Sequence, residues 1–273
     1  MSDLSNIKFG TDVSMGRSVD DTPNEEDYVL HIHDHYEILC LVSGSVNYLV
    51  EGHTYPMQPG CIIIVRPSET HKLIVTGKDR YERYVLGFSS EFIRCTGVDT
   101  ALLSAFNNRP LGAQNQYNPE DFNGIAPIEL FRQMEEQSKY IDEKTAVTSN
   151  LLALLCLIES AYRTKKQSPE NEESNNIGAK LLSYVNRHIS DEISLKSVSE
   201  HVHMSPSQTN RIFKALTGTS LYDYVISKRL VMATELMNHG DGAMEAGRKS
   251  GFKDHSSFYR AYKKKYGKPP SQS

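Results

Sequence analysis

The chain has few cysteines and no long apolar run. Its four cysteines are widely separated and include no CxxC pair, a pattern that favours free thiols in a reducing cytoplasm over a disulfide framework. The longest apolar run, residues 151–158, is far shorter than the roughly 18 residues that a membrane span needs. The N-terminus also lacks the basic-then-apolar build of a secretory signal. We therefore expect a cytoplasmic protein with no membrane partner.

Positive charge is scarce in the front of the chain and concentrated in its rear. Residues 1–177 hold 15 Lys and Arg against 26 Asp and Glu, whereas residues 178–273 hold 15 against 8. An acidic front and a basic rear predict that only the rear meets a polyanion. A basic segment needs a motif beside it before it indicates nucleic-acid binding.

The front of the chain is strand-like up to about residue 88. Runs rich in β-branched and aromatic residues alternate with turn formers; they read YVLHI, EILCLVSG, SVNYLVEG, CIIIVRP, HKLIVTG and YERYVLGF. Short strands at close spacing predict an antiparallel β-barrel or sandwich over about residues 20–90. Cys40 and Cys61 lie inside these runs and are expected to be small core residues.

The middle of the chain changes from irregular to helical. Residues 91–119 show no strong period, but apolar side chains after Pro127 recur at helical spacing and predict helices over 127–140 and 144–163. The second helix is apolar around much of its circumference. It suits either a dimer interface, which we favour, or packing against its own barrel.

A polar segment separates the two halves of the sequence. Residues 165–176 read KKQSPENEESNN and cannot bury enough apolar surface to order themselves, which predicts a linker. We therefore expect a sensing and dimerisation domain over residues 1–163, a linker over 164–177 and a helical domain over 178–273.

A row of polar side chains precedes the second predicted strand. The residues His31, His33, His35 and Glu37 fall on every second position. In an extended strand this period places all four on one face. Such a cluster could hold a metal ion, line a ligand pocket, or form a polar patch satisfied by water.

The rear of the chain contains an internal repeat. SPSQTNRIFKALTG (205–218) and DHSSFYRAYKKKYG (254–267) share the pattern [Ser/Asp]-x5-Arg-x-[Phe/Tyr]-Lys-x3-Gly. Ser205 and Asp254 are good helix N-caps, and Gly218 and Gly267 suit the position after a helix. A shorter apolar-patterned segment precedes each copy, so each unit predicts a helix-turn-helix.

Residues 178–273 resemble the double helix-turn-helix domain of the AraC/XylS transcriptional regulators. The resemblance rests on RIFKALTGTSLYDYVISKRLVMATELM and GFKDHSSFYRAYKKKYGKPP. It implies two recognition helices, over 205–216 and 254–265, that enter successive major-groove segments of an operator, with Arg, Asn, Gln and Ser reading bases and Lys gripping phosphates. The residues so implied are Ser207, Gln208, Asn210, Arg211 and Lys214 in the first helix and His255, Ser256, Ser257, Arg260 and Lys263 in the second.

The sequence departs from this family pattern at several positions. Ala243 and Ala246 occupy what look like isoleucine positions, and Gly247 follows them. His203 stands where the turn often has Gly, and Thr209 where an apolar residue is usual. Lost core volume and helical Gly both weaken a helix, so we expect the second motif to dock on DNA more weakly than the first.

Residues 28–88 resemble the cupin-type barrel that often precedes this DNA-binding domain. His31, His33, Glu37 and Gly44 match the first cupin motif at every spacing. Gly60 and His71 match the second, in which Arg66 replaces a Pro and Ser68 a Gly. In metal-binding cupins the equivalents of His31, His33, Glu37 and His71 coordinate the ion, a donor set suited to Fe, Mn, Ni, Cu or Zn.

Together these features predict an α+β multidomain regulator with an antiparallel β-barrel, a helical dimerisation segment and an all-α DNA reader. We expect no cofactor and no catalytic residues, and a small-molecule effector, such as a sugar, bound by His31, His33, His35, Glu37 and His71. The expected partners are double-stranded DNA, a second copy of the chain and, for an activator, RNA polymerase. The alternatives are a metal-dependent cupin enzyme, a metal-responsive regulator and an architectural DNA binder that no metabolite affects.

Overall fold

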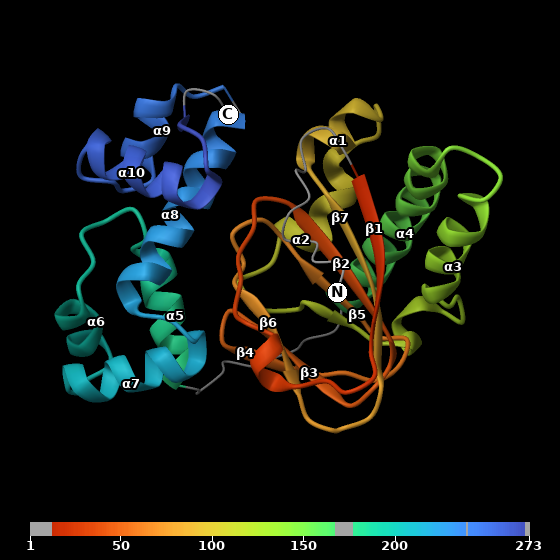
Figure 1. Ribbon diagram of the computed structural model, residues 1–273, viewed down its shortest axis with the longest axis horizontal. Helices are drawn as coiled ribbons and strands as arrows, with labels where there is room; N and C mark the ends of the chain where they lie inside the picture. Colours follow the sequence, from red (N-terminus) through yellow and green to blue (C-terminus); the bar gives the residue numbers. More distant parts are fainter. Residues whose placement is uncertain (1–12, 167–176, 239, 271–273) are drawn as a thin grey trace. The chain divides into compact units, whose positions relative to one another are not determined.

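The computed structural model describes residues 13–166, 177–238 and 240–270. The chain divides into two compact units. The first contains the described strands with helices α1 to α4, and the second contains helices α5 to α10 (Figure 1). Most of the predicted linker lies outside the described residues.

The first unit contains two antiparallel sheets. Its strands are β1 (Val13–Asp20), β2 (Tyr36–Ser43), β3 (Val46–Val50), β4 (His53–Pro56), β5 (Ile62–Val65), β6 (His71–Val75), β7 (Tyr81–Phe88) and β8 (Gln116–Tyr117). One sheet has the order β1-β7-β2-β5-β8, and the other has the order β4-β3-β6. The short 3-10 helix η2 (Glu25–Asp27) follows β1.

The five-stranded sheet is the middle of three layers, with the three-stranded sheet on one face and helices α3 and α4 on the other (Figure 1). Successive side chains of β2 point to opposite faces of the sheet, as in any β-strand. Ile38 and Cys40 belong to the core that includes the helices, whereas Leu39 and Leu41 belong to the core that includes the other sheet. Cys61 joins the second core, so both buried cysteines are core residues as expected.

The structure confirms the antiparallel β architecture and corrects three details of it. The strands remain two separate sheets rather than a closed barrel. The run YVLHI is not a strand, because residues 28–35 form an irregular segment with one isolated bridge at His31. Strands β1, β4 and β8 were not predicted. Strand β4 is only four residues long with alternate exposure and β8 only two residues long, so both are too short for a strong period.

Helices cover the outer face of the five-stranded sheet. They are α1 (Ser90–Cys95), η3 (Thr100–Leu103), α2 (Ser104–Asn107), η4 (Pro119–Phe122), α3 (Ile128–Gln137) and α4 (Glu143–Lys166). By length and composition α4 could cross a membrane, with a mean hydropathy of 1.4 over its most apolar window. Just over half of that window, 56%, is buried in the protein, as in the core helix of a folded domain.

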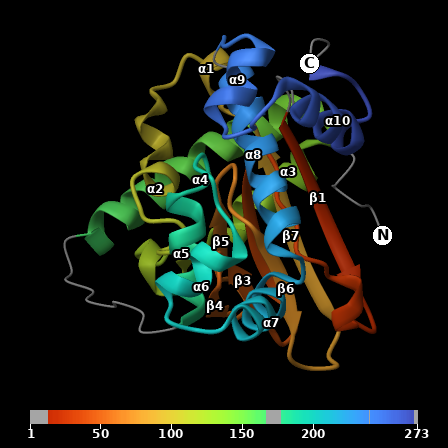
Figure 2. The same cartoon turned by 90° about the vertical axis from the view of Figure 1, so that its left-hand side faces the viewer.

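The second unit consists of a group of three helices and a group of two helices, joined by one long helix (Figure 2). Its elements are α5 (Ile177–Arg187), α6 (Leu195–His201), α7 (Pro206–Thr217), α8 (Leu221–Asn238), α9 (Ala243–Lys249) and α10 (His255–Tyr266). The first half of α8 contributes Leu221 and Tyr224 to a core with α5, α6 and α7. Its second half contributes Leu230 and Ala233 to a core with α9 and α10.

The predicted caps of the two recognition helices are present. Ser205 caps α7 in a capping box with Gln208, and Asp254 caps α10. Gly218 and Gly267 end the two helices in the left-handed conformation, which Gly adopts without a steric penalty. Local sequence signals therefore fix both ends of each helix.

The departures from the family pattern each have a structural counterpart. His203 occupies the turn of the first motif with φ 54°, the left-handed backbone that Gly would favour. Gly247 is buried, and a β-carbon there would lie 2.8 Å from the ring of Phe258. The Phe258 ring thus takes the space left by the small residues of α9, so the second core has no unrepaired gap at this point.

Thr209 is fully buried in α7, and its hydroxyl has no hydrogen-bond partner among the described residues. A buried hydroxyl without a partner costs free energy. We expect Thr209→Val to raise the free energy of unfolding by about 1 kcal/mol. Thr217→Val in the same helix is the matched control, because that buried hydroxyl donates to the carbonyl of Phe213 at 2.8 Å. Urea denaturation of both variants measures the difference; a loss of stability in the first would contradict this account.

Candidate functional site

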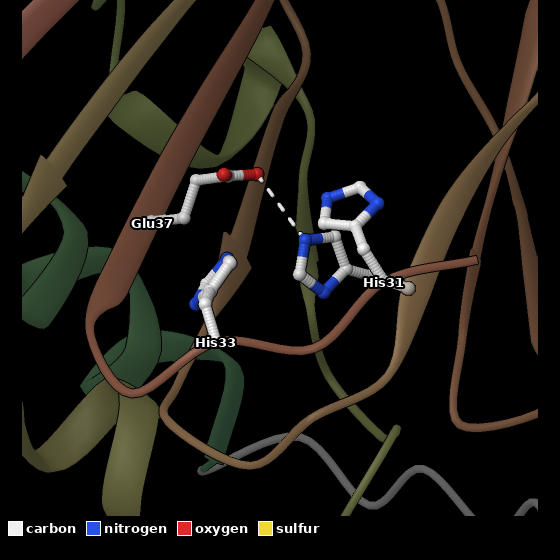
Figure 3. Close-up of side chains that lie close together, drawn as sticks. His31, His33 and Glu37 are labelled. Atoms are coloured by element: carbon white, nitrogen blue, oxygen red, sulfur yellow. Dashed lines mark ion pairs between the residues drawn. The ribbon is translucent and has the colours of Figure 1, made fainter. Parts of the chain in front are cut away.

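Four side chains converge at one end of the two sheets. His31, His33, Glu37 and His71 each offer a donor atom, and these atoms all lie within 4.8 Å of one another. Figure 3 shows the imidazoles of His31 and His33 turned toward the Glu37 carboxylate from the irregular segment before β2. Glu37 and His71 are buried, His33 is half-buried and His31 is exposed, so the cluster extends from the interior to the surface.

Glu37 and His71 lie in different sheets and approach each other across the interface between them. Glu37 lies on β2 and pairs with Gly87 of β7, which puts its side chain on the same face as Leu39 and Leu41. His71 begins β6 in the other sheet. Its Nε2 lies 3.7 Å from Oε1 of Glu37 (Figure 3). The carboxylate and the imidazole therefore approach each other across the gap between the sheets.

Tyr48 supports this carboxylate from β3. Its hydroxyl donates a hydrogen bond to Oε1 of Glu37 at 3.2 Å, and its ring stacks on His71. Burial, together with the negative charge of Glu37, raises the pKa of Tyr48 well above its ordinary value. The phenol therefore remains a proton donor to the carboxylate at neutral pH.

The alternate spacing of the four front residues does not bring all of them together. His31, His33 and Glu37 join the cluster, but His35 is not a member of it; it is buried just before β2. The prediction that a strand period places the four on one face is wrong, because residues 31–35 are not a strand. The cupin-like spacing, which omits His35, identified the cluster correctly.

The altered second motif keeps its backbone conformation. Ser68, which stands where the pattern has Gly, has φ 68°, a left-handed conformation that is uncommon outside Gly. Arg66 donates through Nη1 to the carbonyl of Asn107 at 3.0 Å. The turn before His71 is thus maintained despite both replacements.

The donor set of this cluster fits a divalent transition metal. Three imidazoles and one carboxylate are ligands that such ions accept. Donors around an ion at about 2.1 Å lie at most about 4.2 Å apart, so small side-chain rotations would close the present spacing of up to 4.8 Å. The four residues would hold the ion, which would act as a Lewis acid toward a bound oxygen ligand.

Arg83 is a further polar residue of the inter-sheet region that the sequence did not reveal. It lies on β7 opposite Leu41 and contacts the hydroxyl of Tyr81 through Nη1 at 3.1 Å. The alternation of Tyr81, Arg83 and Val85 in YERYVLGF was the available signal, since both apolar members belong to the inter-sheet core. A charged residue within a strand is more often on the solvent side, which concealed it.

The residues implied to contact DNA lie on the two recognition helices of the second unit. Nine of the ten are exposed: Ser207, Gln208, Asn210, Arg211, Lys214, His255, Ser256, Arg260 and Lys263. Ser257 is half-buried, and its hydroxyl donates to the capping carboxylate of Asp254 at 2.8 Å. The Gln208 carbonyl oxygen accepts from the Ser205 hydroxyl at 3.0 Å. Ser257 and Gln208 therefore also stabilise the starts of their helices.

Comparison with known protein families identifies both units. The family model of the AraC-like ligand binding domain matches residues 19–140. The family model of a helix-turn-helix domain matches residues 198–273. The two matches fall on the sheet-containing unit and on the helical unit, respectively.

Two curated relatives match this chain over most of their own length. The HTH-type transcriptional regulator YfiF of Bacillus subtilis is 23% identical over 252 residues, which cover 90% of this chain and 79% of the relative. The HTH-type transcriptional activator RhaS of Escherichia coli is 23% identical over 261 residues, with 90% and 87% coverage.

Among solved structures, ToxT from Vibrio cholerae aligns over 96% of this chain and 97% of its own, with 15% identity and a TM-score of 0.40. The DNA-binding domain of AdpA in complex with a target DNA aligns over 34% of this chain and 86% of its own, with 20% identity and a TM-score of 0.33.

These findings define a DNA-binding transcriptional regulator with an N-terminal ligand-binding domain and a C-terminal helix-turn-helix domain. The chain belongs to the AraC family.

Proposed function

We propose that this regulator senses a small molecule at the cluster of His31, His33, Glu37 and His71 and adjusts its operator binding accordingly. The observation that carries the proposal is the approach of the buried side chains of Glu37 and His71 beside the largely apolar core between the sheets. Pockets for small molecules are mostly apolar with a few convergent polar groups. Imidazoles and a carboxylate can form hydrogen bonds with the hydroxyl or carboxylate groups of an effector. We propose a cytoplasmic location and, if the protein is an activator, contact with RNA polymerase.

We further propose that the chain forms a homodimer through α4. The exposed face of this helix carries no charged side chain over four turns. This face is formed by Thr145, Ser149, Ala153, Cys156 and Ser160. Small side chains permit close approach of a second helix, and nearly half of the most apolar window of α4 is not buried within the chain. A second copy of the chain is the partner that would cover this face in an isologous contact.

We also propose that the exposed residues of α7 and of α10 contact two successive major-groove segments. Helix α8 has 18 residues and is therefore about 27 Å long. Together with the two motifs it could separate the recognition helices by about 34 Å, one turn of the duplex. Occupancy of the sensing cluster would act on DNA through the pairing of the two copies, a coupling between distinct sites.

A divalent metal ion is the second candidate occupant, favoured by the mutual approach of the four donors. The test is elemental analysis of protein purified without added metal, together with operator titrations before and after chelation. If the site holds a metal-free effector, the purified protein should contain less than one equivalent of metal. A metabolite extract should then change operator affinity by the same factor before and after chelation. One equivalent of metal that is lost in Glu37→Gln would instead support the metal-responsive regulator. Turnover of a metabolite by the metal-loaded protein would support the enzyme.

A further inference from the structure

Arg83 places a positive charge between the two sheets of the ligand-binding unit. Its partner in β2 is Leu41, a fully buried member of the inter-sheet core. The residues two positions away on β7, Tyr81 and Val85, belong to the same core. The side chain of Arg83 therefore shares a face with Glu37, which lies on β2 with the same parity as Leu41.

The guanidinium of Arg83 is bordered by aromatic rings. Its central carbon lies 5.8 Å from the ring centre of Tyr28 and 5.4 Å from that of Tyr81. These two rings meet edge to face. Such contacts favour a cation, but they satisfy none of its N–H groups. The rings thus hold the guanidinium in position and leave its donors directed elsewhere.

The hydrogen-bonding capacity of Arg83 is underused. An arginine has five N–H donors. Within the described part of the chain, Arg83 donates to the Tyr81 hydroxyl at 3.1 Å, whereas its buried Nε has no partner. The side chain as a whole is only half-buried, so part of the guanidinium remains reachable. A buried donor without a partner is costly, and an anionic acceptor would relieve that cost.

No carboxylate of the described residues lies within ion-pair distance of Arg83. Glu82, its neighbour on β7, lies on the opposite face and pairs with Arg17 at 2.5 Å and with Arg80 at 3.6 Å. Glu37 influences Arg83 electrostatically, but its carboxylate is engaged by Tyr48 and His71. The positive charge between the sheets is therefore incompletely compensated by the protein itself.

We propose that Arg83 binds a carboxylate of the effector, which is therefore a small anionic hydroxy acid such as a sugar acid. The planar guanidinium matches a carboxylate through two parallel hydrogen bonds. The hydroxyl groups of the same molecule would reach Glu37 and His71. A singly charged carboxylate fits better than a phosphate dianion, because the negative charge of Glu37 repels the second charge of a phosphate.

This inference rests on the proposed effector site and deepens it by naming the ligand class. The test uses the purified full-length protein and matched probes: glucuronate and galacturonate, the corresponding aldonates, the neutral parent sugars, and glucose 6-phosphate. Binding is measured by calorimetry. We expect saturable binding of one or more of the carboxylates, at least tenfold tighter than binding of its neutral parent and of the phosphate.

Two variants of Arg83 test its role, both through carboxylate affinity and through a melting temperature measured without ligand. Arg83→Met removes the charge but keeps much of the apolar length, and we expect at least a tenfold loss of carboxylate affinity. Without ligand, its melting temperature should be equal to or higher than that of the wild type, because the substitution removes a buried Nε that has no hydrogen-bond partner among the described residues. Arg83→Lys keeps the charge but loses the bidentate geometry; it should fold normally and bind the carboxylate with intermediate affinity.

The outcomes separate this inference from the proposed function. A lower melting temperature of ligand-free Arg83→Met would show a structural role for Arg83 and overturn the inference. Preference for a neutral sugar, with Arg83→Met unchanged in affinity, would also overturn it but would leave the effector site standing. Tight binding of only the phosphate would reject the carboxylate assignment. If no probe binds and operator affinity responds to no metabolite extract, the inference is rejected and the proposed effector function fails with it.

Discussion

Replacing Gly251 by Ala should lower the melting temperature of the DNA-binding unit by more than about 10 °C. Gly251 precedes Phe252 in the turn of the second motif and has φ 90°, a backbone conformation that costs an Ala about 1–2 kcal/mol. A methyl group here would also lie 2.7 Å from both Cα and the carbonyl oxygen of Ser190. Backbone atoms cannot rotate away, so overpacking adds about 1–3 kcal/mol.

The matched controls are Gly240→Ala and Gly267→Ala. Both positions have positive φ values, 100° and 72°, but a methyl group at either would meet no atom of the described residues within 4 Å. They should therefore show the conformational cost alone, about 1–2 kcal/mol. Thermal unfolding followed by circular dichroism measures all three variants. If Gly251→Ala were no worse than its controls, the close approach to Ser190 would carry no energetic weight.

Replacing Arg211 by Ala should weaken operator binding by about 5- to 150-fold, which corresponds to about 1–3 kcal/mol. Arg211 is exposed on α7, and truncation would remove the bidentate contact with guanine that we propose for it. Arg260→Ala, at the equivalent position of α10, should cost less. The reason lies in α9, whose N-cap Gly242 provides no side-chain hydrogen bond, whereas Ser194 caps α6 in a capping box.

Fluorescence anisotropy with a mapped operator compares the two arginine variants at several salt concentrations. Lys214→Ala is the control for a phosphate contact: it should weaken all sequences alike and reduce the salt slope by about one. Arg211→Ala should instead relax the preference for one base pair. Equal losses for Arg211→Ala and Arg260→Ala would refute the weaker docking of the second motif.

Most of the fold was accessible from the sequence where local signals are strong. Caps such as Ser205 and Asp254, and the terminal Gly218 and Gly267, fixed the recognition helices to within a residue. The continuous apolar runs located the central strands β2, β5 and β7 because these strands are buried on both faces. The short strand β4 gave no comparable signal, since its four residues alternate between half-buried and exposed.

The candidate site was only partly predictable, because it depends on pairing between distant strands. Motif spacing correctly grouped His31, His33, Glu37 and His71, although the strand expected over residues 28–32 is absent. Tyr48 and Arg83 were missed since no local pattern shows which face of each strand lies between the two sheets. That face follows from the register of each strand, which is set by the whole sheet and its turns.

The loop between α5 and α6 gives the two DNA-binding motifs a common anchor. Arg229 of α8 donates to the carbonyl oxygens of Ile189 and Asp191, each at 2.7 Å, and the turn at Gly251 rests on Ser190 between them. Neither motif can swivel about α8 without breaking these contacts. The protein should therefore tolerate base changes in its operator better than a change in operator length. One inserted base pair would rotate one half-site relative to the other by about 35°. The two motifs could then not contact both half-sites at the same time.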